Sequence, residues 1–366
     1  MRIVIPVTGF TRSGGSRVLA RFATEWVRAG HDVAFVVNAR STPPYFPTEA
    51  RVCWVDDAGR EVASSAAVDE PLGAGRYAPG NIACLRPALN RYAVDADAVL
   101  ANHSLTAWPV YRARTRARKV YYVQAYEPEY VTERGVRARA KRAVLRSTYH
   151  LPLHRVVNAP MYFRYKALRA RYFVPPGVDE VLFRPDPARR PLETVPLTLG
   201  CIGRPEPGKG TRFALDAYAL LRARGLPVRL AVAYGAVPPE HERLPGLTVV
   251  RPRNDAELAD YYRSLDVLIA PGTVQHGAPH YPVMEAMACG VPVVTTGYMP
   301  AAPDNAWLVP VADSAAIAAA VTEILANPAE ARARAARGLE AMRPFRWPTV
   351  AARMLAHLQG RPPESP

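Results

Sequence analysis

The sequence predicts an α/β protein made of two Rossmann-like domains, each built around a parallel sheet. Short apolar strands alternate with amphipathic helical patterns, and this rhythm stops and restarts near residue 195. The chain has 366 residues, of which 49% are hydrophobic, and this is enough for two packed cores. We expect ligands to bind in a cleft between the domains, where loops leave the carboxyl ends of the strands.

The first half opens with an apolar strand at 2–7 and a turn rich in Gly and Ser at 8–16. A helix follows, because Val18, Phe22 and Trp26 recur every four residues and Gly30 provides a stop. The remaining strands expected in this half lie at 31–37, 97–102 and 119–124.

The second half repeats the pattern from residue 197. Strands are predicted at 197–203, 228–235, 247–252, 266–272 and 291–296, and helices at 211–225, 255–265 and around 282–290. A segment rich in Pro and charge separates the halves and is the natural linker. The predicted organisation is an N-terminal domain over 1–175, a linker over 176–195, a C-terminal domain over 196–340 and a final segment over 341–366.

The composition indicates in which compartment the protein works and whether it binds a cofactor. The four cysteines are scattered without a C-x-x-C pair, which is typical of a reducing compartment. His150 and His154 have helical spacing, but Pro152 lies between them, so we expect no metal site and no other cofactor. The first apolar run is too short for a signal peptide and no apolar stretch is long enough to span a membrane. We therefore expect a cytoplasmic protein.

The net charge of +15 is concentrated in one segment. Residues 112–171 contain 16 Lys and Arg against three acids, a difference of 16 − 3 = +13. The simplest interpretation is a solvated basic face. The alternative is a surface for an anionic partner, either acidic lipid at the inner face of a membrane, a lipid-linked diphosphate or nucleic acid.

A glycine-rich loop follows the first strand of the second half. Gly203 to Lys209 spell G-x-x-x-x-G-K, but a Walker A phosphate loop needs Ser or Thr next, where Gly210 stands, and Thr211 comes one residue late. The loop leads into a helix whose N-terminus attracts phosphate oxygens, and Arg204 and Lys209 add positive charge. It therefore favours metal-free binding of a diphosphate.

A second cluster surrounds Glu285, which we expect just as a helix begins. A carboxylate there can accept two hydrogen bonds from a diol such as ribose. The simpler alternative is an acid stabilised by the helix dipole.

These residues resemble family 4 of the nucleotide-sugar-dependent glycosyltransferases, which have the GT-B fold. The resemblance rests on G-R-x-x-x-x-K-G at 203–210 and E-A-M-A-C-G-V-P-V at 285–293, with further matches at 14–33, 174–185, 261–272 and 345–358. The C-terminal motifs are specific, and the N-terminal ones are weaker. It implies a last helix that crosses back to the N-terminal domain. It also implies transfer of a hexose from a nucleotide-sugar to a glycan, lipid-linked or natural-product hydroxyl, with retention of configuration.

The resemblance implies roles for individual residues. Arg204 and Lys209 bind and stabilise the leaving diphosphate, with Gly203 shaping their loop, and Glu285 binds the ribose. In the N-terminal half, Gly15 lets the backbone approach the donor, and His103 faces the reacting sugar. His280 and Tyr281 complete the donor-binding set.

One position departs from the family. The family has a second Glu with seven residues between the pair, and here that position is Gly277. Gln275, His276 or His280 are candidates to replace it, and backbone N–H groups alone are the other alternative. Residues 121–130 and 278–290 resemble a branch that includes dTDP-rhamnosyltransferases, so dTDP-rhamnose is the first donor to consider, and dTDP-, UDP- and GDP-sugars are all open. Glu127 and Glu129 are candidate acceptor-side groups, unless they simply occupy a surface loop.

Two other classes of function remain open from the residues. A P-loop ATPase or kinase fits the Gly-rich loop but lacks the hydroxyl at Gly210. A nucleic-acid-binding protein fits the basic segment and its aromatic residues, but no binding motif of known spacing appears. In the glycosyltransferase interpretation no side chain is an evident nucleophile, so we expect front-face attack.

Overall fold

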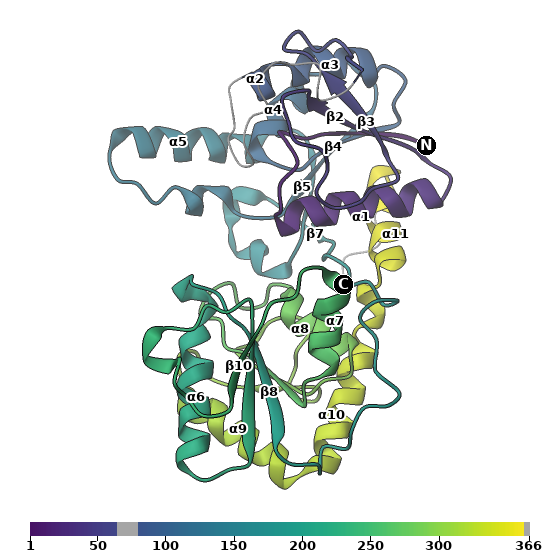
Figure 1. Cartoon of the computed structure of the whole chain (residues 1–366). Coiled ribbons are helices and arrows are strands. Elements are labelled where there is room, and N and C mark those ends of the chain that lie inside the picture. The colour runs from purple at the N-terminus through teal and green to yellow at the C-terminus, as the bar shows by residue number, and fades with distance from the viewer. Residues whose placement is uncertain (64–79, 362–366) are drawn as a thin grey trace. The chain divides into compact units, whose positions relative to one another are not determined.

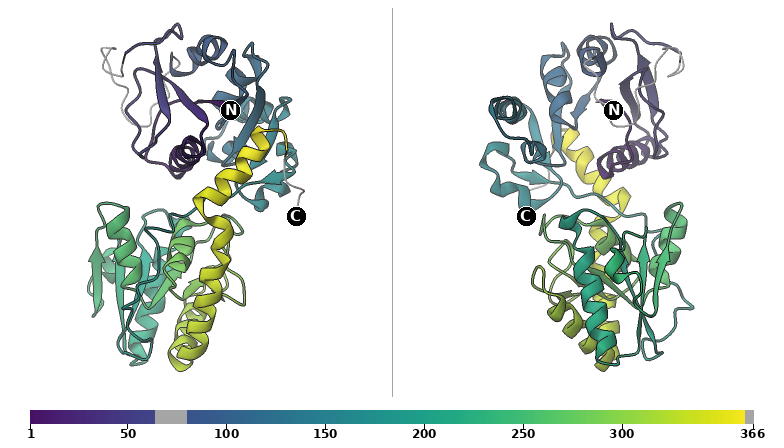
Figure 2. Two further views of the ribbon diagram at one scale, coloured as in Figure 1. Left: turned by 90° about the vertical axis from the view of Figure 1, so that its right-hand side faces the viewer. Right: turned by 60° about the vertical axis from the view of Figure 1, so that its left-hand side comes forward.

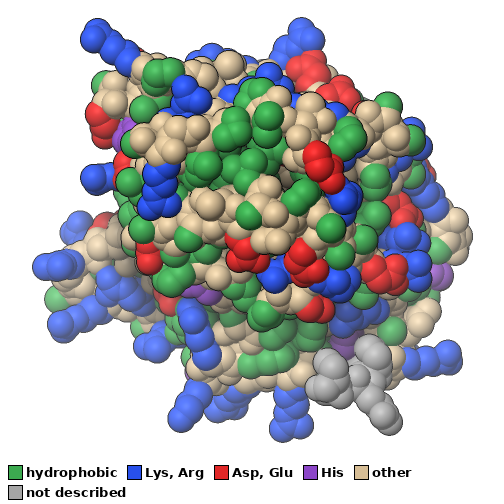
Figure 3. Space-filling view, turned by 90° about the horizontal axis from the view of Figure 1, so that it is seen from below, with side chains coloured by type: hydrophobic (Ala, Val, Ile, Leu, Met, Phe, Trp, Pro, Cys, Tyr) green, Lys and Arg blue, Asp and Glu red, His purple; other side chains and the backbone are tan. Residues whose placement is uncertain are grey.

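The computed structural model describes residues 1–63 and 80–361. The chain divides into unit 1, Met1–Gly177 with Trp347–Pro366, and unit 2, Val178–Arg346 (Figure 1). None of the helices that the model describes is long and apolar enough to cross a membrane. Lys and Arg side chains project from much of the rim of the face drawn in Figure 3, as the net charge predicts.

Unit 1 is built on a parallel seven-stranded sheet in the order β3-β2-β1-β4-β5-β6-β7. The strands are β1 (Arg2–Pro6), β2 (Asp32–Asn38), β3 (Arg51–Val55), β4 (Ala98–Ala101), β5 (Arg118–Val123), β6 (His154–Val157) and β7 (Tyr172–Phe173). The helices are α1 (Gly14–Arg28), α2 (Gly80–Ala83), α3 (Leu85–Tyr92), α4 (Ser104–Arg112), α5 (Val136–Ser147) and α11 (Trp347–Leu358). The four predicted strands and the first helix are confirmed, whereas β3, β6 and β7 were not predicted.

The last helix of the chain belongs to the core of unit 1. Trp26, buried as the four-residue spacing predicts, donates from its indole N–H to the carbonyl of Ala351 over 2.9 Å. Trp347 meets Phe22 edge to face, with ring centroids 5.9 Å apart. Helix α11 therefore lies along the sheet of unit 1 (Figure 2). The expected return of the chain is confirmed, although residues 362–366 of that segment lie outside the described residues.

Unit 2 is built on a parallel six-stranded sheet in the order β10-β9-β8-β11-β12-β13. Its strands are β8 (Leu197–Ile202), β9 (Val228–Ala233), β10 (Leu247–Val250), β11 (Val267–Ala270), β12 (Val293–Thr295) and β13 (Trp307–Leu308). Its helices are α6 (Thr211–Ala223), α7 (Asp255–Arg263), α8 (Tyr281–Ala288), α9 (Ser314–Ala326) and α10 (Pro328–Ala341). All the elements predicted here are present, and the sheet order places the ends of β8 and β11 side by side.

Most of the segment expected to be a linker packs onto unit 2. Phe183 is buried in the core of that unit. Arg189 donates hydrogen bonds to the carbonyls of Gly290 and Leu265, and Arg190 pairs with the buried carboxylate of Asp266. From residue 178 onward the segment is therefore part of unit 2 rather than a free connection.

Candidate functional site

The Gly-rich loop of unit 2 runs from the end of β8 to the start of α6, as predicted. Its first residue, Gly203, donates its N–H to the carbonyl of Ala233 at the end of β9, over 2.8 Å. A Cβ at Gly203 would lie 2.7 Å from the Val232 side chain and 2.9 Å from the Ala236 amide nitrogen. Only glycine fits this position, so the loop can pass close to the neighbouring strand.

Thr211, the residue that seemed to come one place late, holds the loop closed. Its hydroxyl accepts a hydrogen bond from the N–H of Arg204 and donates one to the carbonyl of the same residue, each over 3.0 Å. The Thr211 side chain is buried. Its hydroxyl is therefore occupied in fixing the backbone that carries Arg204, rather than offered to a metal ion.

Gly210 could not be the Ser or Thr of a Walker A loop. Its backbone is left-handed, with φ of 72°, and an added Cβ would lie 2.0 Å from the carbonyl oxygen of Pro271. A side chain there would strain the backbone and collide with the end of β11. The conformation of the loop therefore requires glycine at position 210 and excludes the Ser or Thr of a Walker A loop. This argues against the ATPase interpretation.

We expect Gly210→Ser to destabilise the protein by about 3 kcal/mol or more, because backbone strain and the collision with Pro271 add together. Gly225 is a matched control, since it has the same φ of 72° but nothing within 4 Å of an added Cβ. The measurement is urea unfolding of both serine variants. Equal losses of stability would contradict the collision with Pro271.

Three predicted donor-binding residues meet beside this loop. Lys209 is half-buried, and burial followed by the charge of Arg204 lowers its pKa. Burial, then the charges of Lys209 and Arg204, lowers the pKa of His280 to about 3. His280 is therefore neutral at physiological pH, and its buried Nδ1 has no hydrogen-bond partner in the described residues.

The position of the absent family carboxylate is a turn that disfavours side chains. Gly277 has φ of 79° and donates its N–H to the carbonyl of Gly297 over 2.9 Å. Next to it, the rings of His276 and His280 lie 5.7 and 4.3 Å from the ring of Tyr298. Of the candidate replacements, His276 and His280 therefore belong to an aromatic cluster, whereas Gln275 is exposed.

Glu285 does not lie where the sequence suggested. Helix α8 begins at Tyr281, so Glu285 is in its second turn and gains little from the helix dipole. The Glu285 side chain is only 2% exposed. Burial of Tyr262 is the main cause that raises the pKa of its hydroxyl, and the nearby negative charge of Glu285 is the second. The prediction that Glu285 starts the helix is wrong, because α8 begins four residues earlier, with Pro282 in its first turn, and the loop before it is shorter than the glycines and prolines indicated.

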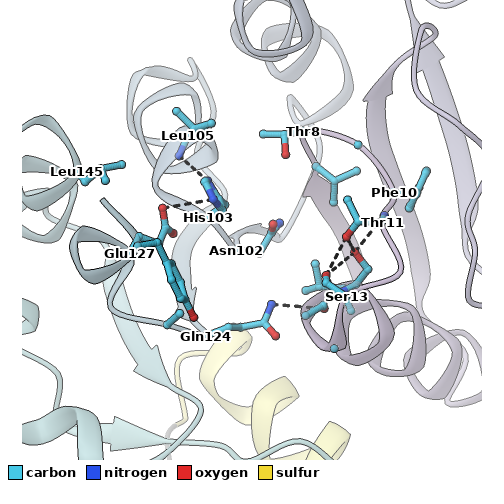
Figure 4. A pocket seen from close by; sticks show the side chains of 18 of the residues that line it. Thr8, Phe10, Thr11, Ser13, Asn102, His103, Leu105, Gln124, Glu127 and Leu145 are labelled. Carbon is cyan, nitrogen blue, oxygen red and sulfur yellow. Dashed lines mark hydrogen bonds and ion pairs between the residues drawn. The ribbon is translucent and has the colours of Figure 1, made fainter. Parts of the chain in front are cut away.

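Unit 1 has a hollow of about 890 Å³ at the carboxyl ends of β1, β4 and β5 (Figure 4). Gly15 lies on it, and an added Cβ there would be 3.2 Å from the Gln124 amide nitrogen. Its other lining residues include Thr8, Phe10, Thr11, Ser13, Asn102, His103, Gln124, Glu127, Lys141, Val144 and Leu145. The structure therefore brings Gly15 and His103 to one place in unit 1.

His103 and Glu127 form a pair within this hollow. The Nδ1 atom of His103 accepts a hydrogen bond from the N–H of Leu105, capping α4, so the proton of the neutral ring is on Nε2. That Nε2 lies 3.3 Å from Glu127 Oε2, and Glu127 also accepts hydrogen bonds from the N–H and hydroxyl of Ser104. His103 is therefore held in place and lacks a spare nitrogen for removing a proton.

The two acids of the loop after β5 differ. Glu127 is buried on the hollow, so the surface-loop alternative is wrong for it. Glu129 is exposed and accepts a hydrogen bond from the Tyr165 hydroxyl over 2.6 Å.

Reasoning from sequence also missed Gln124 and Tyr298, although each closely follows a strand, where ligand-contacting residues gather in such sheets.

Comparisons with known proteins identify relatives of this chain. Residues 196–327 match the family model "Glycosyl transferases group 1". The chain is 31% identical over 219 residues to the O-antigen biosynthesis protein RfbC of Myxococcus xanthus, covering 58% of this chain and 16% of that protein. It is 31% identical over 216 residues to a GDP-mannose-dependent alpha-(1-6)-phosphatidylinositol monomannoside mannosyltransferase of Mycolicibacterium smegmatis, covering 51% of this chain and 56% of that protein. The chain thus spans less than two thirds of the length of either relative.

Solved structures share the whole architecture. Sucrose-phosphate synthase from Thermosynechococcus elongatus has a TM-score of 0.74 and 20% identity, covering 98% of this chain and 99% of that one. HepE of Anabaena in complex with UDP-glucose has a TM-score of 0.70 and 15% identity, covering 98% and 100%. These likenesses establish the fold.

Proposed function

Since residues 196–327 form a glycosyl transferases group 1 domain within a GT-B fold, we propose that this chain transfers a hexose from a nucleotide-diphosphate donor to an acceptor hydroxyl. The observation that carries the proposal is the loop from β8 to α6. Its backbone is fixed by Thr211, and it brings Arg204 and Lys209 to a helix N-terminus. Such a site neutralises a leaving diphosphate without a metal ion.

We propose the same roles for the other residues that the sequence indicated. Glu285 binds the ribose hydroxyls, and His280 with Tyr281 contacts the donor. The neutral His280 ring offers a hydrogen bond without charge, which suits a sugar hydroxyl near Gly277, where the family carboxylate is absent. In this proposal the transfer retains configuration by front-face attack.

The sequence leaves several nucleotide-sugars open as the donor, and we propose dTDP-rhamnose as the first candidate. A thermal-shift panel of dTDP-, UDP- and GDP-sugars tests it, because a donor that binds the folded state raises the melting temperature by mass action. We expect one nucleotide series to raise it by several degrees, and the Lys209→Ala variant to lose that rise. A shift with Mg²⁺-ATP alone, abolished by EDTA, would instead support the ATPase alternative.

The hollow of unit 1 suits a lipid-linked acceptor at an acidic membrane. Helix α5 lies at the outer edge of unit 1 (Figure 1) and exposes Val136 and Val144 by 81% and 60%. Cationic side chains flank these valines on the helix surface, among them Arg139 and Lys141. Val144 and Lys141 also line the hollow, so one surface offers both apolar contact and positive charge to an acceptor.

We expect Val136→Ser/Val144→Ser to reduce co-sedimentation with phosphatidylglycerol vesicles several-fold, because the two valines are the largest apolar groups that α5 exposes. The matched control is Val181→Ser, since Val181 is 77% exposed in unit 2. If the double variant and the control bind vesicles as the unchanged protein does, α5 is a solvated face.

A further inference from the structure

A second hollow in unit 1 lies at the opposite edge of the sheet from the one that holds His103. It has a volume of about 480 Å³ and sits at the amino ends of β6 and β7. Its lining is Leu153, His154, Arg155, Arg169, Ala170, Arg171 and Tyr172. Three guanidinium groups therefore share one concave place, and the described residues that line it include no carboxylate.

Arg155 is the most constrained of these side chains. One terminal nitrogen donates to the carbonyl of Leu151 over 2.6 Å. Its Nε is buried, yet it has no hydrogen-bond partner in the described residues. A buried donor without a partner costs free energy, so this atom needs an acceptor that the neighbouring protein does not supply.

Arg169 adds a second unfavourable feature. Its backbone is left-handed, with φ of 46°, which is uncommon for a long side chain. Burial and the charge of Arg169 both lower the pKa of Arg155, so the two cations are close enough to repel each other. An anion between them would remove this repulsion, and a shift of the Arg155 side chain toward the anion would give the buried Nε a partner.

We propose that this hollow binds a phosphate-bearing ligand, at a site separate from the donor loop of unit 2 and the hollow at the carboxyl edge. Guanidinium groups match phosphate oxygens in paired, planar geometry, and three of them suit a phosphate with more than one negative charge. The phosphate comes either from a soluble molecule or from a phospholipid headgroup. The proposal does not depend on sugar transfer, because none of these residues belongs to the proposed catalytic set.

The hollow adjoins the contact that fixes the last helix. His154 Nε2 lies 3.0 Å from Nδ1 of His357 in the last turn of α11, and Arg118 donates to the His357 carbonyl over 2.8 Å. Burial lowers the pKa of both histidines to about 4, so the pair is neutral near pH 7 and adds no cationic charge. A ligand bound beside this contact stabilises folded unit 1 by mass action.

The test uses the whole 366-residue chain carrying Lys209→Ala, so that the donor loop contributes less to phosphate binding. Inorganic pyrophosphate is titrated by calorimetry, and vesicles of phosphatidylcholine with or without phosphatidylglycerol are co-sedimented. The test variant adds Arg169→Gln/Arg171→Gln at two exposed positions. The matched control adds Arg86→Gln/Arg91→Gln on α3, which removes the same charge from exposed positions of the same unit.

We expect the Arg169→Gln/Arg171→Gln change to weaken pyrophosphate binding by about ten-fold or more, and the control to change it by less than about two-fold. Selective loss of vesicle binding alone identifies a phospholipid headgroup as the source of the phosphate. Equal losses in both variants would show only that the protein is basic. That result, or no binding of either probe before the change, would overturn the proposal.

Discussion

Replacing Lys209 by Ala is expected to lower kcat by about 100-fold or more while leaving the fold intact. The side chain is half-buried beside Arg204 at the start of α6, where the charge of a leaving diphosphate would develop. Its loss removes a charge that acts mainly in the transition state, so kcat falls with kcat/KM. The measurement is steady-state kinetics with the donor found by the thermal-shift panel, together with a melting temperature for each variant.

Lys166→Ala is the control, because Lys166 is exposed in unit 1.

The environment of Lys209 also predicts that activity depends on pH. Burial, and after it the charge of Arg204, lowers the pKa of Lys209, so its positive charge is lost at a lower pH than that of an ordinary lysine. We expect the alkaline loss of activity to begin below about pH 10.4 and to vanish in Lys209→Arg, whose charge persists. Wild-type kcat in Lys209→Ala would remove this residue from the site.

The second large effect is expected from Glu285→Gln. If the carboxylate accepts two hydrogen bonds from the ribose, the neutral amide should raise the KM of the donor by about ten-fold, and Glu285→Ala by about 100-fold. The Glu242→Gln control changes the same charge at an exposed position of unit 2.

A purely structural role for Glu285 predicts a different pattern. The side chain is buried and close to Tyr262, so removing it could also loosen the packing of α7 against α8. In that case both Glu285 variants should lower the melting temperature in the absence of donor, with KM unchanged in the protein that remains folded. Kinetics and melting measured on the same samples therefore separate the two roles.

The sequence predicted the two sheets well because their strands are apolar and bounded by glycine and proline. It missed β3, which has five residues, and also β6, β7 and β13, which have four, two and two residues and are too short to show a period. The loop between β8 and α6 was predicted to its helix boundary, since a continuous apolar strand precedes it and a helical pattern begins at Thr211. The Glu285 prediction failed because nothing local shows how far an irregular loop extends before α8.

Contacts between distant residues were beyond reach for a different reason. The pairing of His103 with Glu127 joins positions 24 residues apart on neighbouring strand ends. The approach of Arg155 to Arg169 depends on where the turns after β6 lead the chain. Pattern and spacing describe each strand end separately, whereas these contacts are set by the order of strands in the sheet.

The packing of α11 into unit 1 bears on how the protein is made. During synthesis, residues 1–177 emerge from the ribosome before Trp347 and Ala351 have been added to the chain. Phe22 then lacks its partner Trp347, and Trp26 lacks its partner Ala351. Unit 2 is continuous in sequence and has all its residues before Trp347 is synthesised. Unit 2 can therefore reach its final packing during translation, whereas unit 1 waits with an uncovered aromatic face, the kind of surface that chaperones protect.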